Sequence, residues 1–246
     1  MPSALAAREK GLPLVNIAQP FKSSGMMLTC RKDMGVNSTD DLKGKTLGVW
    51  FYGNEYPFLS WMSRLGLATD GSSDGVTVLK QGWGVEPLTE GQAACVSTMS
   101  YNEYWVVRDA GYTPEELTVF KYQNEGASTL EDGLYVLEKN LGDSNFKDKM
   151  VRFVRASMKG WKYAEANPKE AASIILDNDD AGVQTEKHQV RMMGEIAKLT
   201  AGSNGALDPA DYERTVKVLM SGASDPVITK QPSGAWTHDI TNAALN

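Results

Sequence analysis

The 246-residue sequence has few cysteines and histidines, no excess of positive charge and no long apolar run. No stretch approaches the roughly 18 apolar residues that a membrane-spanning helix needs, so we expect no membrane insertion. The net charge of −6 argues against a nucleic-acid partner, because phosphate binding requires clustered Lys and Arg. The scarce Cys and His residues form no catalytic constellation and no zinc motif, and no Walker loop is present. We therefore expect a globular protein without a metal or cofactor.

The two cysteines, Cys30 and Cys95, each lie in an apolar stretch that is typical of a buried strand. Their spacing matches no metal-binding motif. A buried free thiol behaves as a small apolar side chain. We therefore expect two free cysteines, and a disulfide between them is the alternative.

The most informative stretch runs from Asp41 to Gly66. A polar turn leads into Thr46–Trp50, whose apolar and β-branched residues predict a short buried strand. The loop Phe51–Glu55 follows, and Pro57 then lies in the first turn of a helix. A loop between a strand and a helix lies at the carboxyl edge of an α/β sheet, where ligands bind and helix N–H groups are free. A plain connection between the two elements is the alternative.

The same arrangement returns about fifty residues later along the chain. Ala93–Met99 predicts a strand, and Ser100 opens a helix with Glu103 at the spacing of a capping box. Glu103 is therefore either a capping carboxylate or a ligand contact. Tyr101, Tyr104 and Trp105 place more aromatic surface in one turn than a cap requires, which suits a flat small molecule and a packed core equally well.

Alternating strands and helices, followed by a helical C-terminal part, predict an α/β protein with mainly parallel strands. Further strands are expected at Leu14–Ala18, Gly25–Cys30, Val76–Lys80, Leu117–Tyr122 and Leu134–Glu138. Later helices are expected at Phe146–Ala166, Pro168–Asn178, Thr185–Leu199 and Pro209–Met220. Lys187, Arg191 and Glu195 lie on one face of the third of these helices, where we expect a solvent-exposed stripe.

The order of these motifs resembles a known family. The stretches that carry the resemblance are Asp41–Trp50 (DLKGKTLGVW), Phe51–Phe58 (FYGNEYPF), Gly91–Gln92, Ser100–Trp105 (SYNEYW) and Glu131–Tyr135 (EDGLY). They are similar to those of the NMT/THI-like solute-binding proteins of ABC transporters, which bind thiamine-pyrimidine precursors, sulfonates such as taurine, nitrate or flavins. The resemblance implies a two-lobed periplasmic-binding-protein type II fold, an ABC permease as partner and a periplasmic or extracytoplasmic location.

The resemblance also implies how the chain is divided. Residues 1–28 and 126–246 are expected to form lobe I with the C-terminal helices, and residues 29–125 to form lobe II. Met1–Gly11 matches the end of a helix that family members reach after several earlier βα units, so lobe I is expected to be incomplete at its N-terminus. Met1–Gly11 also lacks the apolar segment of a signal peptide, so export rests on the resemblance alone. A non-functional fragment is the alternative.

The candidate ligand-binding residues come from four loops that the predicted cleft brings together. They are Ser23, Ser24, Phe51, Tyr52, Gly53, Asn54, Glu55, Tyr101, Asn102, Glu103, Trp105, Glu131 and Asp132. Carboxylates and aromatic rings suit a small heteroaromatic nitrogen compound of the thiamine-pyrimidine-precursor kind. A sulfonate, nitrate or flavin is the alternative, although the loops at 51–55, 101–105 and 128–132 contain no Arg or Lys. Binding is expected to close the lobes about hinges at Arg31–Asp33 and Glu125–Ser128.

An enzyme is the competing class of protein. Eukaryotic thiamine-pyrimidine synthases share the fold and carry a cysteine-rich CCCFC segment. Gly126–Gly133 occupies the corresponding region here and contains no cysteine. We therefore expect a binding protein and not an enzyme.

Overall fold

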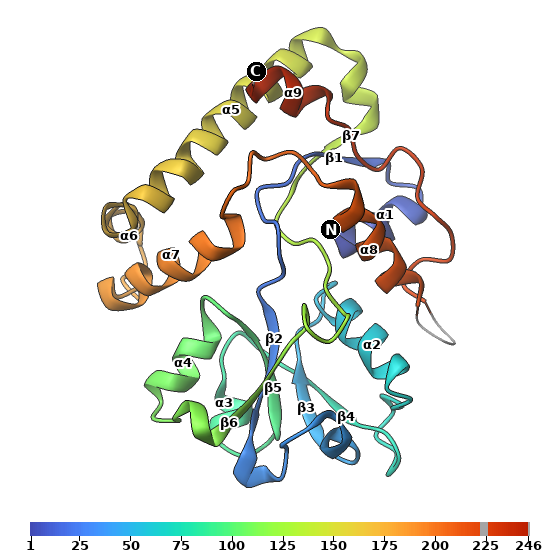
Figure 1. Cartoon of the computed structure of the whole chain (residues 1–246), viewed down its shortest axis with the longest axis vertical. Coiled ribbons are helices and arrows are strands. Elements are labelled where there is room, and N and C mark those ends of the chain that lie inside the picture. Colours follow the sequence, from blue (N-terminus) through green and yellow to red (C-terminus); the bar gives the residue numbers. More distant parts are fainter. Residues whose placement is uncertain (222–225, 246) are drawn as a thin grey trace.

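The computed structural model describes residues 1–221 and 226–245, and it has two lobes (Figure 1). The lower lobe in Figure 1, here called lobe II, is built on a five-stranded sheet. The upper lobe, lobe I, has a two-stranded sheet and most of the helices. The predicted two-lobed α/β fold is confirmed.

Lobe II has the strand order β4-β3-β5-β2-β6. Its strands are β2 (Met26–Arg31), β3 (Thr46–Val49), β4 (Thr77–Lys80), β5 (Cys95–Met99) and β6 (Leu117–Lys121). Its α-helices are α2 (Glu55–Arg64), α3 (Glu86–Thr89) and α4 (Glu103–Asp109). β3 is parallel to β4 and β5, whereas β2 is antiparallel to both of its neighbours, β5 and β6.

The expectation of mainly parallel strands was wrong. β2 carries the chain from lobe I into lobe II, and β6 carries it back (Figure 1). The two strands lie side by side, so they run in opposite directions. Only the strands joined through helices within the lobe, β3, β4 and β5, pair in the parallel manner expected of βα units.

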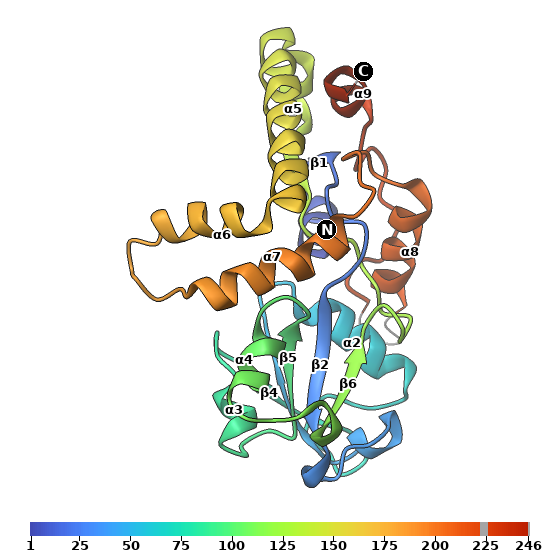
Figure 2. The same cartoon turned by 60° about the vertical axis from the view of Figure 1, so that its left-hand side comes forward.

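Lobe I pairs its two strands antiparallel and surrounds them with helices. The strands are β1 (Leu14–Ala18) and β7 (Leu134–Leu137). The helices are α1 (Pro2–Glu9), α5 (Ser144–Ala166), α6 (Pro168–Asp177), α7 (Glu186–Thr200), α8 (Pro209–Met220) and α9 (Asp239–Leu245). The proline near the start of α6 and of α8 supports the predicted starts of these helices, because the first turn of a helix needs no proline N–H. In Figure 2, α6 and α7 form a hairpin that projects to one side. No helix of the part that the structure describes is both long and apolar enough to span a bilayer.

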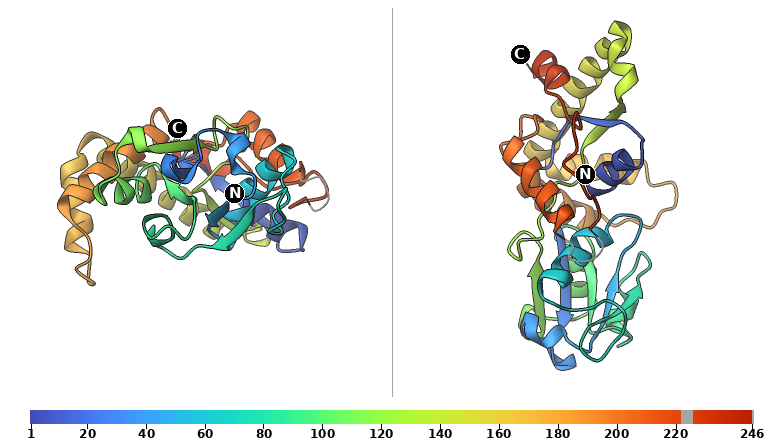
Figure 3. Two further views of the ribbon diagram at one scale, coloured as in Figure 1. Left: turned by 90° about the horizontal axis from the view of Figure 1, so that it is seen from below. Right: turned by 90° about the vertical axis from the view of Figure 1, so that its right-hand side faces the viewer.

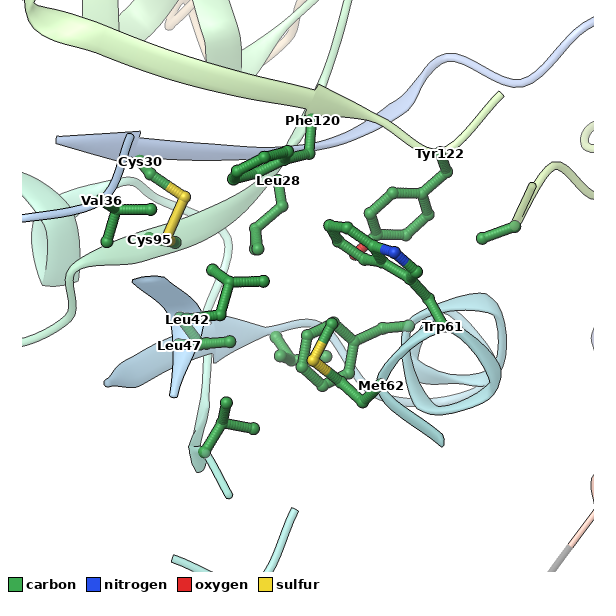
Figure 4. Close-up of a cluster of buried hydrophobic side chains, with 14 of the residues drawn as sticks. Leu28, Cys30, Val36, Leu42, Leu47, Trp61, Met62, Cys95, Phe120 and Tyr122 are labelled. Atoms are coloured by element: carbon green, nitrogen blue, oxygen red, sulfur yellow. A yellow bond between two sulfur atoms is a disulfide. The ribbon is translucent and has the colours of Figure 1, made fainter. Parts of the chain in front are cut away.

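The core of lobe II packs helix α2 against the sheet. Trp61 is only 1% exposed, and its ring centroid lies 5.6 Å from that of Phe120 and 5.5 Å from that of Tyr122 (Figure 4). Large aromatic side chains contribute strongly to a core because each one buries a large apolar area. This core holds the sheet whose upper edge faces lobe I.

Cys30 and Cys95 are joined by a disulfide in the same core (Figure 4). The expectation of two free thiols was therefore wrong. The two cysteines lie directly opposite each other on the antiparallel strands β2 and β5. Their separation of 65 residues does not reveal that these two strands are neighbours, which is why the sequence left the pairing open.

The chain crosses between the lobes twice, along residues 19–25 and 122–133 (Figures 1 and 3). The expected hinge at Glu125–Ser128 lies on the second crossing, where Arg64 of α2 donates to the carbonyl oxygens of Glu125 and Gly126. The hinge expected at Arg31–Asp33 was misplaced, because these residues follow the end of β2 that is remote from lobe I (Figure 1).

The lobes also touch through α7 and α4. Lys187 and Arg191 of α7 both pair with Asp109 of α4. The expectation of solvent exposure holds for Lys187, whose side chain is 72% exposed although it pairs with Asp109, and is wrong for Arg191, whose side chain is 21% exposed. Glu195 pairs with Lys198 on its own helix. The sequence shows the spacing of these charges but not the carboxylate that faces them from another element.

Candidate functional site

The candidate site lies where the parallel strands β3, β4 and β5 end. Because parallel strands share one carboxyl edge, the loops that follow them lie together, on the side of lobe II that faces lobe I. These loops line a cavity of about 470 Å³, which is within the size range of small-molecule sites. Its lining residues are Trp50, Phe51, Tyr52, Asn54, Lys80, Gln81, Gly82, Trp83, Met99, Tyr101, Asn102 and Glu103.

Aromatic rings form much of the lining of this cavity. Trp83 is 95% exposed and Tyr52 is 88% exposed, which is unusual for such large side chains. Trp50 is held in place because its indole Nε1 donates to the carbonyl oxygen of Gly82 at 2.9 Å. Tyr52 has a φ of 66°, a strained value for a residue with a side chain, and such strain is concentrated at functional sites. Flat faces that project into solvent beside a cavity are suited to stacking on a planar ligand.

Glu103 is the carboxylate of the cavity, and it caps the turn before α4. The backbone N–H of Met99 donates to its Oε2 at 2.9 Å, and the amide nitrogen of Asn102 donates to its Oε1 at 2.7 Å. The helix begins at Glu103 itself, so Ser100 is not the N-cap that the capping-box spacing predicted. Burial raises the pKa of Glu103, while these hydrogen bonds act in the opposite direction.

A smaller cavity of about 160 Å³ adjoins the first at the junction of the lobes. It shares Asn54, Met99 and Tyr101 with the larger cavity and is closed on the other side by Thr129, Glu131 and Asp132. Burial raises the pKa of Tyr101, and the nearby carboxylates of Asp132, Glu131 and Glu103 raise it further. The two cavities together are therefore lined by acidic groups, which favour a ligand with N–H donors or positive charge.

Most of the hydrogen-bonding capacity of the Glu131 carboxylate is used within the protein. It accepts hydrogen bonds from the hydroxyl of Ser24 and from the backbone N–H groups of Gly25, at 2.9 Å, and Met26, at 3.3 Å. Burial raises the pKa of Glu131, and these hydrogen bonds oppose that effect. Ser24 lies in the first crossing and Glu131 in the second, so this carboxylate ties the two crossings together.

The structure brings most of the predicted residues to the two cavities. Phe51, Tyr52, Asn54, Tyr101, Asn102 and Glu103 line the larger cavity, and Gly53, Glu131 and Asp132 line the smaller one. Ser23, Ser24, Glu55 and Trp105 line neither of them. Glu55 accepts the backbone N–H of Gly53 at 2.6 Å within its own loop. Trp105 donates to the carbonyl oxygen of Ser100 and turns its ring towards Arg191 of α7.

Sequence reasoning missed the loop after β4. It supplies Gln81, Gly82 and Trp83 to the larger cavity, next to Lys80 at the end of β4, and Trp50 and Met99 also line this cavity. The signal was available, because Val76–Lys80 was predicted to be a strand of the same sheet and its loop had to reach the same edge. The cavity does contain a basic residue, since the Lys80 ammonium lies 4.8 Å from the centre of the Tyr52 ring and 5.6 Å from that of Phe51.

Gln81 anchors this loop to the sheet. Its side chain is buried, accepts the backbone N–H of Ser97 at 2.9 Å and donates to the carbonyl oxygen of Ser97 at 3.0 Å.

Across residues 1–221 and 226–245, no group of three or more His, Cys, Asp or Glu side chains could hold a metal ion. The site is thus a cavity of aromatic and polar groups at one edge of the sheet.

Comparison with known proteins identifies relatives of the chain. A family model described as NMT1/THI5 like matches residues 1–171. The formylaminopyrimidine-binding protein of Halalkalibacterium halodurans is 24% identical over 225 residues, which cover 89% of this chain and 66% of that protein. The chain therefore spans just under two thirds of the length of that relative.

Solved structures share the fold at low sequence identity. A protein from Bordetella bronchiseptica RB50 has a TM-score of 0.72 at 18% identity, over 98% of this chain and 77% of that one. The periplasmic sulfonate-binding protein SsuA from Methylobacillus flagellatus KT has a TM-score of 0.64 at 14% identity, over 98% and 71% of the two chains. The desulfurization enzyme DSZB has a TM-score of 0.61 at 15% identity, over 99% and 83%. These likenesses show a periplasmic-binding-protein type II fold and leave the ligand open.

Proposed function

Because this chain belongs to the NMT1/THI5-like family, we propose that it is the solute-binding protein of an ABC importer and binds an aminopyrimidine-like ligand. The ligand occupies the larger cavity and extends into the smaller one, between the lobes. The observation that carries the proposal is the position of Glu103, a carboxylate beside exposed aromatic rings at the shared edge of β3, β4 and β5.

The chemistry of an aminopyrimidine matches these groups. Its ring is flat and stacks on Tyr52, Trp83 or Tyr101, and its amino group donates to a carboxylate. Glu103 and Asp132 supply acceptors on the two sides of the junction between the lobes. The relative from Halalkalibacterium halodurans is named for binding a formylaminopyrimidine, which supports the same class of ligand.

A sulfonate is the second candidate, and Lys80 is the observation that favours it. Its ammonium lines the larger cavity and could pair with an anionic group. The acidic residues around Tyr101 act against an anion, because a sulfonate in the smaller cavity would lie beside Glu131 and Asp132. We therefore rank the aminopyrimidine first.

Isothermal titration calorimetry with a formylaminopyrimidine and with taurine separates the two candidates. We expect the formylaminopyrimidine to bind and its affinity to fall by about 10-fold or more in Glu103→Gln, the loss typical of a hydrogen bond to a charged group. Lys80→Met should change this affinity little, and Glu90→Gln, an exposed carboxylate of the same lobe, serves as the matched control. Binding of taurine that is abolished by Lys80→Met would favour the sulfonate instead.

The proposal includes no chemical step on the ligand. The desulfurization enzyme shares the fold at 15% identity, which carries no information about activity here. Mass spectrometry of ligand recovered after incubation with the protein should return it unchanged. A converted product would overturn the binding-only proposal.

Partner and location follow from the same proposal. A solute-binding protein delivers its ligand to the permease of an ABC transporter, which we propose as the partner of this chain. The sulfonate-binding protein of Methylobacillus flagellatus, which shares the fold, is periplasmic by its name, and we propose a periplasmic or extracytoplasmic location for this chain.

A further inference from the structure

Helix α7 of lobe I makes a polar contact with the wall of the larger cavity in lobe II. Figures 1 and 2 show the end of the α6–α7 hairpin above α4. The imidazole Nε2 of His188 lies 2.7 Å from the side-chain oxygen of Asn102. Asn102 lines the larger cavity, whereas His188 lines neither cavity. A residue of one lobe thus touches a wall residue of the other without reaching the ligand space.

The contact continues through Asn102 to Glu103 and β5. The amide nitrogen of Asn102 donates to Oε1 of Glu103 at 2.7 Å, and the N–H of Met99 donates to Oε2 at 2.9 Å. A carboxylate only accepts hydrogen bonds, so the amide group of Asn102 has to direct its nitrogen towards Glu103. Its oxygen then faces His188, and the imidazole Nε2 has to carry the proton.

The protonation state of His188 agrees with a hydrogen bond donated from its Nε2 to Asn102. Burial lowers the pKa of His188, the Arg191 guanidinium lowers it further, and Asp109 acts in the opposite direction. The ring is therefore neutral at neutral pH, and its single proton is the one that Asn102 accepts.

We propose that His188 is a positioning residue for ligand binding, which orients Asn102 and Glu103 through the contact of lobe I with lobe II that the structure shows. Lobe I then does more than cover the ligand, because it also completes the hydrogen-bonded chain that aims the Glu103 carboxylate. This inference rests on the proposed binding function and specifies how one lobe controls the affinity of the other.

Neighbouring contacts of α7 keep His188 at this place. Arg191 lies over the Trp105 ring, 4.6 Å from its centre, and donates to Asp109 at 2.9 Å. Lys187 lies 3.1 Å from the same carboxylate. Exposed ion pairs of this kind each contribute little to stability, so they can form and break as the lobes move. They explain why Trp105 faces α7 and does not line the cavity.

The first test needs no ligand and follows hydrogen exchange of the Met99 amide. His188→Ala removes the donor, so Asn102 and Glu103 lose their fixed orientation and the Met99 amide should exchange about fivefold faster, the effect of one ordinary hydrogen bond. His188→Gln places an amide N–H where the imidazole Nε2–H was, and should restore slow exchange. Lys198→Ala, on the same helix, should leave exchange unchanged and controls for effects on α7 itself.

The second test measures affinity for the formylaminopyrimidine in the same variants. We expect about fivefold weaker binding in His188→Ala, recovery in His188→Gln and no change in Lys198→Ala. Equal Met99 exchange in wild type and His188→Ala would overturn the inference. The inference would also be overturned if the Met99 amide exchanged as fast in His188→Gln as in His188→Ala, while urea denaturation showed His188→Gln to be as stable as wild type. Failure of the wild type to bind the formylaminopyrimidine counts against the proposed function alone, because the exchange result still decides the role of His188.

Discussion

Glu131 illustrates the difference between a residue that faces a cleft and a residue that is available to a ligand. The sequence predicted it as a ligand contact from its place in the EDG turn. In the structure its oxygens accept three donors from residues 24–26, so most of its hydrogen-bonding capacity is used by the protein. Its principal role is therefore to connect the two crossings between the lobes.

We expect Glu131→Gln to lower the free energy of unfolding by about 1–3 kcal/mol, the cost of leaving a buried donor without an acceptor. The amide nitrogen of Gln replaces one of the two carboxylate oxygens and cannot accept a hydrogen bond. Either the N–H of Gly25, which donates to Oε2, or the Ser24 hydroxyl and the Met26 N–H, which both donate to Oε1, therefore lose their acceptor. Urea denaturation of both proteins measures the difference. Glu90→Gln, at an exposed position, should stay within about 0.5 kcal/mol of wild type. Equal midpoints for wild type and Glu131→Gln would contradict this role.

Glu103 should make stability depend on pH. Burial raises its pKa above the ordinary value of 4.5, so the folded state binds the proton more tightly than the unfolded chain does. The stability contributed by such a carboxyl is present below its unfolded pKa and is lost as the pH rises through the folded pKa. The free energy of unfolding of wild type relative to Glu103→Gln should therefore fall as the pH rises from about 4 towards neutrality. Urea denaturation across this range tests the sign, and a difference that grows with pH would contradict it.

At the scale of single residues, the sequence predicted which loops line the site better than it predicted which side-chain atoms remain available to a ligand. Phe51 and Tyr101 were placed at the sheet edge by the strand and helix patterns around them. Whether Glu55 or Glu103 faces a ligand depends on side-chain hydrogen bonds, and these are set by tertiary contacts that local sequence does not determine. Glu55 turns back to Gly53, whereas Glu103 remains on the cavity wall.

At the scale of elements, the site depends on three parallel strands that end at one edge. The strand and helix patterns predicted β3, β4 and β5 to within about two residues, because apolar runs and proline positions mark the elements strongly. The sequence did not show that β2 enters the sheet against their direction, because strand pairing depends on contacts distant in the chain. The same limit hid the neighbouring positions of Cys30 and Cys95.

The disulfide between β2 and β5 should stabilise lobe II. It closes a loop of 65 residues, and cross-links over loops of this length typically contribute about 2–4 kcal/mol by restricting the unfolded chain. We expect the double substitution of Cys30 and Cys95 to Ala to lower the unfolding free energy by this amount without changing the site. Urea denaturation under oxidising conditions gives the value. Equal stability of the double variant and wild type would show that the bond contributes nothing in solution.

At the scale of the whole molecule, the contacts between the lobes are of two kinds. The two chain segments that cross between the lobes, which Glu131 connects by hydrogen bonds, hold the lobes together permanently. The contacts of α7 with α4 can break as the lobes separate. A ligand that touches residues of both lobes binds the closed state better than the open state, and this difference in affinity shifts the population. The two-lobed fold was predictable through family resemblance, whereas the α7–α4 contact was not, because Asp109 and Arg191 are distant in sequence.

We expect the radius of gyration to fall when the protein is saturated with a formylaminopyrimidine, because the ligand favours the closed arrangement. Small-angle X-ray scattering with and without ligand measures this change. His188→Ala should show a smaller fall at the same fractional saturation, because its closed state lacks one contact. A radius of gyration that is unchanged at saturation would contradict closure.

The most direct test of the account is the crystal structure of the protein with a bound formylaminopyrimidine. We predict electron density for the ring in the cavity at the ends of β3, β4 and β5, with its face against an aromatic side chain and its amino group within hydrogen-bonding distance of Glu103. Density for the ligand at another place on the protein, or a ligand in this cavity that contacts Lys80 through an anionic group and leaves Glu103 untouched, would contradict it.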